Sequence, residues 1–197
     1  TFINFDSNKI RLEIDNEVSY DKDVKDGELD LIFINKSTSF NYEINKNSFI
    51  FSSKDQKNTY EGIIDFKPFY LKANFNYKGL SLKNLFNDES IIADIIKSEI
   101  FNNKNLNASI KLIVNDITNI VELNDLVLRA GIDEGNFNFS DSSISWKDDV
   151  KIILNDSLLS YDGNEINIIG KFVFEFIDID NFYRYFQLPK NFRKKIS

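Results

Sequence analysis

Two residue types that carry much of protein chemistry, His and Cys, are absent from this chain of 197 residues. A Ser-His-Asp triad, a Cys nucleophile, a haem with a His ligand and a zinc site with His or Cys ligands therefore cannot be built from it. The main remaining candidates are the 31 acidic residues. Sugar hydrolysis would need two of them about 5–10 Å apart across a cleft. No spacing in the sequence singles out such a pair.

Two charged segments are the next candidates for a binding site. The acidic stretch DKDVKD at 21–26 carries Asp21, Asp23 and Asp26. Their spacing departs from the calcium loop, whose ligands stand at positions one, three and five with Gly at six, so we interpret the stretch as a solvated turn. The basic stretch KNFRKK at 190–195 could contact anionic lipid headgroups, although such runs are more often the solvated face of a helix. The sequence predicts neither a metal site nor a cofactor.

The composition narrows the class of protein. The net charge of −7 and the pI of about 4.8 argue against a nucleic-acid binder, which usually presents a basic face to phosphates. The chain contains no Met, so we expect it to be a piece of a longer protein, with any signal peptide or membrane anchor outside it. Within it, no apolar run reaches the roughly 18 residues of a membrane helix.

The elements that must position these side chains are strands in which polar and apolar residues alternate. PFYLKANFNY at 68–77 is the clearest case. Its apolar side chains fall on one side of the strand: Phe69, Leu71, Ala73, Phe75 and Tyr77. Because strand side chains alternate between the two faces, this pattern predicts a sheet with one apolar and one polar face. The same pattern recurs at 29–35, 109–114, 136–140 and 166–176.

Strands are predicted in two groups. The first group has turn signals at Asp26-Gly27 and at 45–47, with Pro68 at a strand start or edge. Its strands are expected at 9–14, 29–35, 40–44, 48–53, 59–66 and 68–77. The second group covers 105–176, with turns at 131–136, 147–149 and 161–165.

Helices are predicted after each group of strands. Between 80 and 102, apolar residues recur every three or four positions, as in an amphipathic helix. Ser81 could cap a first short helix there, and Asp88 or Ser90 a second. A further helix is expected from about Asp180 to a stop near Pro189, where another helix begins.

The predicted fold class is mainly β (α+β): a curved antiparallel sheet forming a half-pipe or sandwich, with helices near 80–102 and 180–196. We expect 1–197 to be a single segment of a longer protein. Its parts are a first β part at 1–78, a helical insertion at 79–104, a second β part at 105–178 and C-terminal helices at 179–197.

The apolar strand face is the candidate site, and two interpretations stand side by side. One is an ordinary packed core, which periodicity alone favours. The other is an open apolar trough, for which the 19 Phe residues provide an unusually large face. The residues that would line such a groove are Phe69, Leu71, Phe75, Ile110, Leu112, Phe137, Phe139, Ile168, Phe172 and Phe174.

The order of the segments resembles that of AsmA-like proteins. YEGIIDFKPFYLKANFNYKGLSLKNLF at 60–86 resembles their strand pair leading into a short helix, and 92–114 is similar to the helix, Asn-Leu turn and strand that follow. The stretch 123–196 resembles the AsmA C-terminal region, including Gly170 before a last strand and an Asp-led helix ending in FYRYFQLP. The resemblance covers 59–196 well and 1–58 weakly. It rests on order and hydrophobic pattern, without a catalytic signature.

The resemblance implies a bacterial cell-envelope protein in the periplasm, anchored to the inner membrane by a helix outside this segment. AsmA-like proteins belong with bridge-like lipid transfer proteins, which are long curved sheets with an apolar inner face. This implies no enzyme and no catalytic residues, phospholipid acyl chains as partners, and a role in lipid transport and outer-membrane biogenesis. Two alternatives remain open: a scaffold that binds envelope proteins at strand edges, and a carbohydrate-binding or carbohydrate-active β-domain.

Overall fold

The fold is that of a mainly β protein, as the alternating strands predict. The computed structural model describes residues 2–6, 10–15, 23–33, 36–54, 56–81, 105–134, 136–162 and 165–193. Most of the described residues lie in strands. The predicted helix near 80–102, with its candidate caps at Asp88 and Ser90, lies almost wholly outside the described residues.

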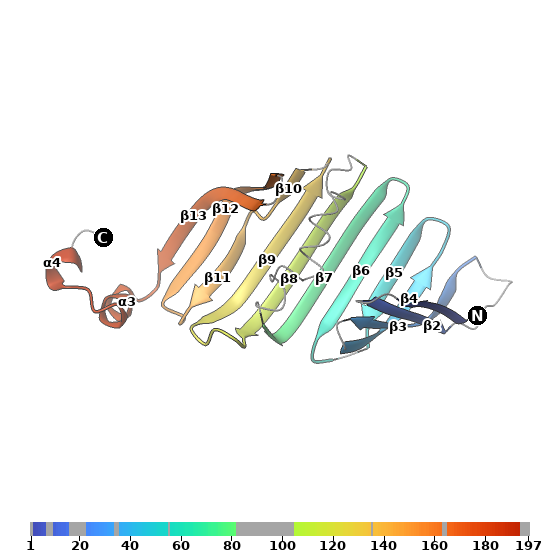
Figure 1. The fold of residues 1–197 in the computed structure, drawn as a ribbon, viewed down its shortest axis with the longest axis horizontal. Coiled ribbons are helices and arrows are strands. Elements are labelled where there is room, and N and C mark those ends of the chain that lie inside the picture. Colours follow the sequence, from blue (N-terminus) through green and yellow to red (C-terminus); the bar gives the residue numbers. More distant parts are fainter. Residues whose placement is uncertain are drawn as a thin grey trace.

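The strands of the described residues form one sheet (Figure 1). In the first half they are β1 (Phe2–Asp6), β2 (Ile10–Asp15), β3 (Lys25–Phe33), β4 (Lys36–Ile44), β5 (Ser48–Ser53), β6 (Thr59–Phe66) and β7 (Phe69–Leu80). In the second half they are β8 (Asn107–Ile117), β9 (Leu123–Asp133), β10 (Asn136–Asn138), β11 (Ser142–Trp146), β12 (Val150–Asp162) and β13 (Glu165–Phe176). The helices are α3 (Ile179–Tyr185) and α4 (Lys190–Arg193).

Neighbouring strands follow the chain order from β1 to β9. The sheet then divides, because β9 pairs with both β10 and β11, and each of these also pairs with β12. β13 pairs with β12 at the end of the sheet. Every pair is antiparallel, as expected, except β7 and β8, which are parallel. A parallel pair needs a long crossover connection, and the stretch between Leu80 and Asn107 supplies it.

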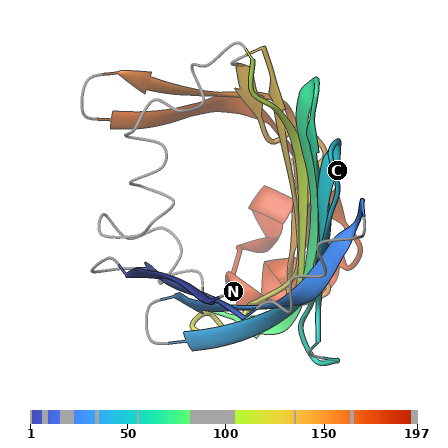
Figure 2. The same ribbon diagram turned by 90° about the vertical axis from the view of Figure 1, so that its right-hand side faces the viewer.

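The sheet is strongly curved and does not close on itself. Figure 2, which looks along the row of strands, shows it as an open arc. Of the two predicted forms, the half-pipe is therefore the one the chain adopts, since a sandwich would need a second sheet packed on the first.

Most of the turns predicted from local sequence signals lie where the structure has them. β5 and β6 have the predicted bounds, and Pro68 directly precedes β7. The Asp26-Gly27 signal was wrong as a turn, because both residues lie inside β3, opposite Glu43 and Tyr42 of β4. The pairing with β4 extends past the signal, so the sheet ladder overrides the local preference for a turn.

The C-terminal helices also follow the prediction. Asp178 caps α3 by accepting a hydrogen bond from the backbone N–H of Asn181 at 2.9 Å. Pro189 stands directly before α4, where its missing N–H costs nothing. The chain therefore stops and restarts a helix where the sequence indicates.

Two buried serines, Ser142 and Ser157, form hydrogen bonds with backbone groups where the sheet divides. The backbone N–H of Arg129 donates to the Ser142 hydroxyl at 2.9 Å, and that hydroxyl donates back to the Arg129 carbonyl at 3.3 Å. The backbone N–H of Phe139 donates to the Ser157 hydroxyl at 2.7 Å. These hydroxyls satisfy backbone groups at points where the strand ladder is interrupted, and such groups are costly to leave unpaired.

We predict that Ser142→Ala lowers the free energy of unfolding by about 1–3 kcal/mol, because it leaves two backbone groups of Arg129 without this partner. Ser145→Ala, on the other face of the same strand, is the matched control and is expected to change stability by less than about 0.5 kcal/mol. Urea unfolding followed by the fluorescence of Trp146 measures both. Equal losses in the two variants would contradict the role assigned to Ser142.

Candidate functional site

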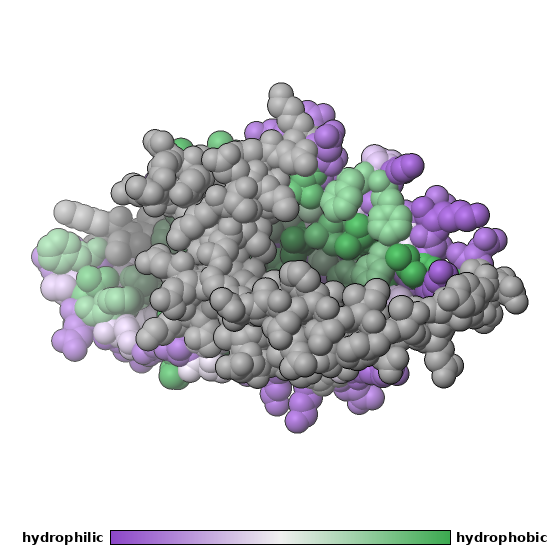
Figure 3. Space-filling model, turned by 45° about the vertical axis from the view of Figure 1, so that its right-hand side comes forward, coloured by the Kyte–Doolittle hydropathy of each residue, from purple (hydrophilic) through white to green (hydrophobic). Residues whose placement is uncertain are grey.

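The concave face of the sheet is apolar from β4 to β9. The register places Leu71 beside Ala108 and Ile132, and Phe75 beside Leu112 and Leu128. Partners in a register point to the same face, so these side chains form rows that run across the strands. Figure 3 shows hydrophobic side chains gathered in a hollow, with hydrophilic ones around its visible outer side.

On the convex face, polar side chains of β6 and β7 are joined by cross-strand hydrogen bonds. The Asn74 amide donates to the Glu61 carboxylate at 3.2 Å, and the Asn76 amide donates to the Thr59 hydroxyl at 3.1 Å. Both pairs join β6 to β7. The period-two alternation of PFYLKANFNY therefore separates a water-facing surface from an apolar one.

Aromatic rings line the first part of the concave face. Phe40 contacts Tyr60 with ring centroids 5.3 Å apart, and Tyr60 contacts Tyr77 at 5.9 Å. Tyr42 stacks on Phe49 at 5.8 Å. These contacts link β4, β5, β6 and β7 into a continuous aromatic row, and such ring pairs stabilise beyond their buried area.

Gly62 makes room for this aromatic row. A Cβ atom at this position would lie 2.4 Å from Cζ of Phe51 and 2.8 Å from the backbone oxygen of Lys72. Only a residue without a side chain therefore lets the Phe51 ring lie over β6.

We predict that Gly62→Ala destabilises the protein by about 1–3 kcal/mol, because it displaces the Phe51 ring. Gly79→Ala serves as control: the atom nearest to its Cβ would be the Thr118 methyl group, at 3.2 Å, and the backbone oxygen of Asp116 would lie at an ordinary 3.8 Å. Thermal unfolding measures the difference between the two. A Gly62→Ala variant as stable as Gly79→Ala would show that the ring adjusts without cost.

The middle of the concave face is closed. Val114 is 0% exposed and Ala73 is 2% exposed. Ala108, Ala130, Ile132 and Phe137 form a buried cluster. In this middle part the apolar face is a packed core, which agrees with the interpretation of the face as an ordinary core.

The last part of the concave face is open. Phe172 and Phe174 of β13 are 59% and 55% exposed. They stand opposite Leu154 and Ile152 of β12, so they continue the same apolar face. The molecule therefore combines a closed centre with an open end, where large apolar side chains meet solvent.

The residues predicted to line a groove mostly share this face. Phe69, Phe172 and Phe174 are exposed, whereas Phe137 is buried and packs edge-on against Phe139, with centroids 4.7 Å apart. The half-buried residues of the set are Leu71, Phe75, Ile110, Leu112 and Phe139. Ile168 pairs with Leu159 in the ladder, but its side chain lies outside the described residues.

The prediction missed the aromatic row of β4 to β6. Its signal was present, because FNYEI and SFIFSS alternate aromatic and polar residues as β7 does. The prediction also missed Trp146, which lies against Phe186 of the chain after α3, with ring centroids 5.4 Å apart. No pattern in the sequence around Trp146 indicates that its partner lies 40 residues further along the chain.

Two tyrosines on this face have perturbed acidity. Burial raises the pKa of Tyr42 above its usual value of 10.0, and the Asp26 carboxylate raises it further. Burial also raises the pKa of Tyr77, with a smaller contribution from Tyr60. Both rings hold their protons because the apolar face disfavours a phenolate.

We predict a loss of stability in alkali. A folded-state pKa above the unfolded value of 10.0 contributes stability that is complete below pH 10 and is lost as the pH rises through the folded-state pKa. Urea unfolding at a series of pH values should show this decline, and Tyr77→Phe should make it shallower. An unchanged slope in Tyr77→Phe would contradict the assignment.

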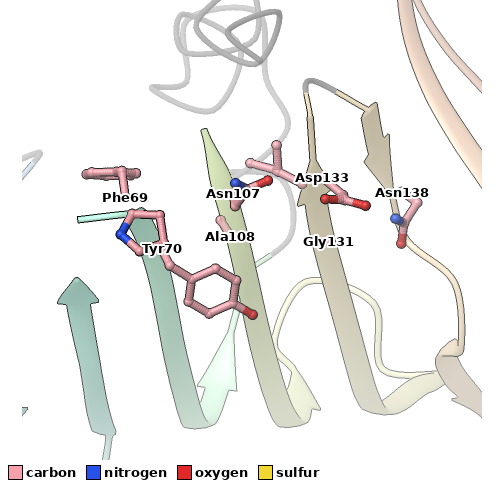
Figure 4. Close-up of a pocket in the computed structure, with 9 residues that line it drawn as sticks. Phe69, Tyr70, Asn107, Ala108, Gly131, Asp133 and Asn138 are labelled. Atoms are coloured by element: carbon pink, nitrogen blue, oxygen red, sulfur yellow. The ribbon is translucent and has the colours of Figure 1, made fainter. Parts of the chain in front are cut away.

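A small pocket lies at one rim of the sheet, where β7 and β8 begin and β9 ends. It has a volume of about 300 Å³. Its polar lining comes from Tyr70, Asn107, Asp133 and Asn138, which Figure 4 shows gathered at neighbouring strand ends. Asp133 is the one carboxylate among the pocket residues, so the pocket lacks the pair that sugar hydrolysis needs.

Of the acidic stretch at 21–26, only residues 23–26 are among the described residues. Asp26 lies within β3, and Asp23 lies 3.5 Å from the Lys46 amine. Among the described residues, no group of three or more His, Cys, Asp or Glu could hold a metal ion. No helix in that part of the chain has the length and apolar character needed to cross a membrane.

Comparison with protein-family models, with curated proteins and with solved structures gives no match for this chain. The site must therefore be interpreted from its own geometry and chemistry.

Proposed function

We propose that the concave face shields or conducts phospholipid acyl chains, and that the chain is a non-enzymatic segment of an AsmA-like envelope protein. The observation that supports this most is the open end of the face, where Phe172 and Phe174 remain exposed in line with the covered apolar rows. Large contiguous apolar patches on a protein surface mark sites that receive an apolar partner. The periplasmic setting and an inner-membrane anchor outside the chain rest on the resemblance alone.

The energetics suit an acyl-chain ligand. A phospholipid must keep about 30 CH₂ groups out of water, and each is worth about 0.8 kcal/mol. The Phe, Ile and Leu side chains of the concave face attract such groups without direction. A lipid held by them can shift along the face without breaking specific hydrogen bonds, so passive sliding needs no energy source.

The size of the sheet also suits this ligand. Neighbouring strands lie about 4.8 Å apart, so this sheet, in which β10 and β11 share one position, extends about 50 Å across its strands. One leaflet of a bilayer has a hydrocarbon thickness of about 15 Å. The sheet is therefore longer than one acyl chain, and its open end at β13 is the part that an acyl chain can reach.

We predict that phospholipid co-purifies with the chain and is detected by native mass spectrometry or lipid extraction. A fluorescent fatty acid should bind in vesicle-free solution. The double variant Phe172→Ser, Phe174→Ser should weaken this binding by about thirtyfold, because each half-exposed ring contributes about 1 kcal/mol of apolar contact.

Ile169→Ser is the control for this experiment. Ile169 belongs to the same strand and is 66% exposed, but it lies on the opposite face. Acyl-chain carriage would be contradicted if no phospholipid co-purified and the fatty acid did not bind. It would also be contradicted if Ile169→Ser weakened binding as much as the double variant.

The carbohydrate alternative has one observation in its favour. The rim pocket brings together Tyr70, a residue that is 38% exposed, with Asn107, Asn138 and Asp133. This combination of ring and polar groups can hold a sugar without cleaving it. Oligosaccharide binding that is lost in Asp133→Asn, in a chain that carries no lipid, would favour this function over the first.

The scaffold alternative rests on β13, which pairs only with β12 among the described strands. An edge strand offers unpaired backbone groups to a partner strand. A specific protein partner, captured by the chain in the absence of lipid, would favour this role.

A further inference from the structure

We propose that α3 and α4 form a membrane-docking tip, which binds the surface of an anionic lipid bilayer at the β13 end of the sheet. The tip consists of the apolar residues Ile177, Tyr185, Phe186 and Phe192 and the basic residues Arg184, Lys190 and Arg193. Figure 1 shows both helices projecting past β13 at one end of the molecule. This surface is distinct from the concave face, so the inference does not depend on acyl-chain binding there.

The tip exposes an unusual amount of apolar surface. Ile177 is 72% exposed, and Tyr185, Phe186 and Phe192 are 48%, 51% and 50% exposed. Aromatic side chains of this kind are enriched where proteins meet the interface between lipid and water. In water, exposed aromatic side chains on two short helices add no stability to the fold.

The charge of the tip opposes that of the rest of the chain. From Arg184 to the last residue the sequence RYFQLPKNFRKKIS contains five basic residues and no acid, in a chain whose net charge is −7. The acids closest in sequence, Asp178 and Asp180, belong to the start of α3, and Asp178 is engaged as its cap. A basic surface that also exposes aromatic rings matches an anionic bilayer better than an acidic protein surface. On a bilayer the basic side chains are attracted to the anionic headgroups, and the rings are buried at the boundary of the acyl chains.

The sheet holds α3 in place through an aromatic cluster. Phe182 contacts both Phe176 of β13, at 5.1 Å between centroids, and Trp146 of β11, at 5.8 Å. The Lys147 amine lies 3.6 Å from the centroid of the Tyr185 ring. The tip is therefore anchored to the end of the concave face by the same apolar surface that forms the face.

The second helix is anchored to the first. The Tyr183 hydroxyl donates to the Arg193 carbonyl at 2.6 Å, and the Arg193 side chain donates to the Leu188 carbonyl at 3.0 Å and lies over the Tyr183 ring. Tyr183 is buried. These contacts orient Lys190 and Phe192 as one unit, so little order has to be gained on binding.

The test uses the 197-residue chain and two kinds of vesicle, one of phosphatidylcholine alone and one with a third of phosphatidylglycerol. Co-sedimentation should show binding to the anionic vesicles, at least tenfold tighter than to the neutral ones and weakened by added salt. Lys190→Glu should weaken it by fivefold or more, because each basic residue contributes about fivefold near an anionic surface. Ile177→Ser should weaken it by about fivefold through lost apolar burial.

The controls match the variants in residue type. Lys67→Glu makes the same charge change in the turn before β7, and Ile169→Ser removes an equally exposed Ile from the convex face; both should bind vesicles as the parent chain does. Equal binding to both kinds of vesicle, no binding at low salt, or equal losses in the controls would each overturn the proposal. Fatty-acid binding measured without vesicles reports on the concave face alone. It therefore shows whether a negative vesicle result concerns the tip or the whole lipid-binding proposal.

Discussion

The one-sidedness of the sheet is the constraint on which the rest of the structure depends. Among the strands whose side chains are described, β4 to β9 gather their large apolar side chains on the concave face. Among the described residues, no second sheet covers this apolar face. The sheet curves into an open arc (Figure 2), and its hydrophobic side chains gather in a hollow with hydrophilic ones on the visible outer side (Figure 3).

Several local features make this curvature possible. β12 contains a register shift between Asn155 and Leu158, and the pairing of β9 with β11 shifts between Ser143 and Ser145. Asp125 and Asp156, at or beside these shifts, have positive φ angles of 47° each, which Asp tolerates better than most residues. Such bulges bend a strand and increase its twist. The buried Ser142 and Ser157 hydroxyls then satisfy the backbone groups that the irregular pairing leaves over.

The concave face changes character along the molecule, and this bears on what it can do. It begins with an aromatic row at β4 to β7, passes through the closed cluster around Ala108 and Ile132, and ends with exposed rings on β13. The tip formed by α3 and α4 stands at that exposed end, held there by Trp146 and Phe176. The proposed acyl-chain site would then open beside the proposed membrane-docking tip, an arrangement that suits the movement of lipid between a membrane and the sheet.

Alternation of polar and apolar residues was enough to predict the strands, the two faces and most of the lining, because side-chain direction in a strand depends only on position along it. It could not predict the parallel pairing of β7 and β8, the division of the sheet at Ser142, or the contact of Trp146 with Phe186. Each of these depends on residues far apart in the sequence. The sequence by itself thus determined that Phe137 and Phe174 lie on the same apolar face. Only the tertiary structure decided that Phe137 is buried in a core while Phe174 meets solvent, because exposure depends on how the sheet curves and on what packs against it.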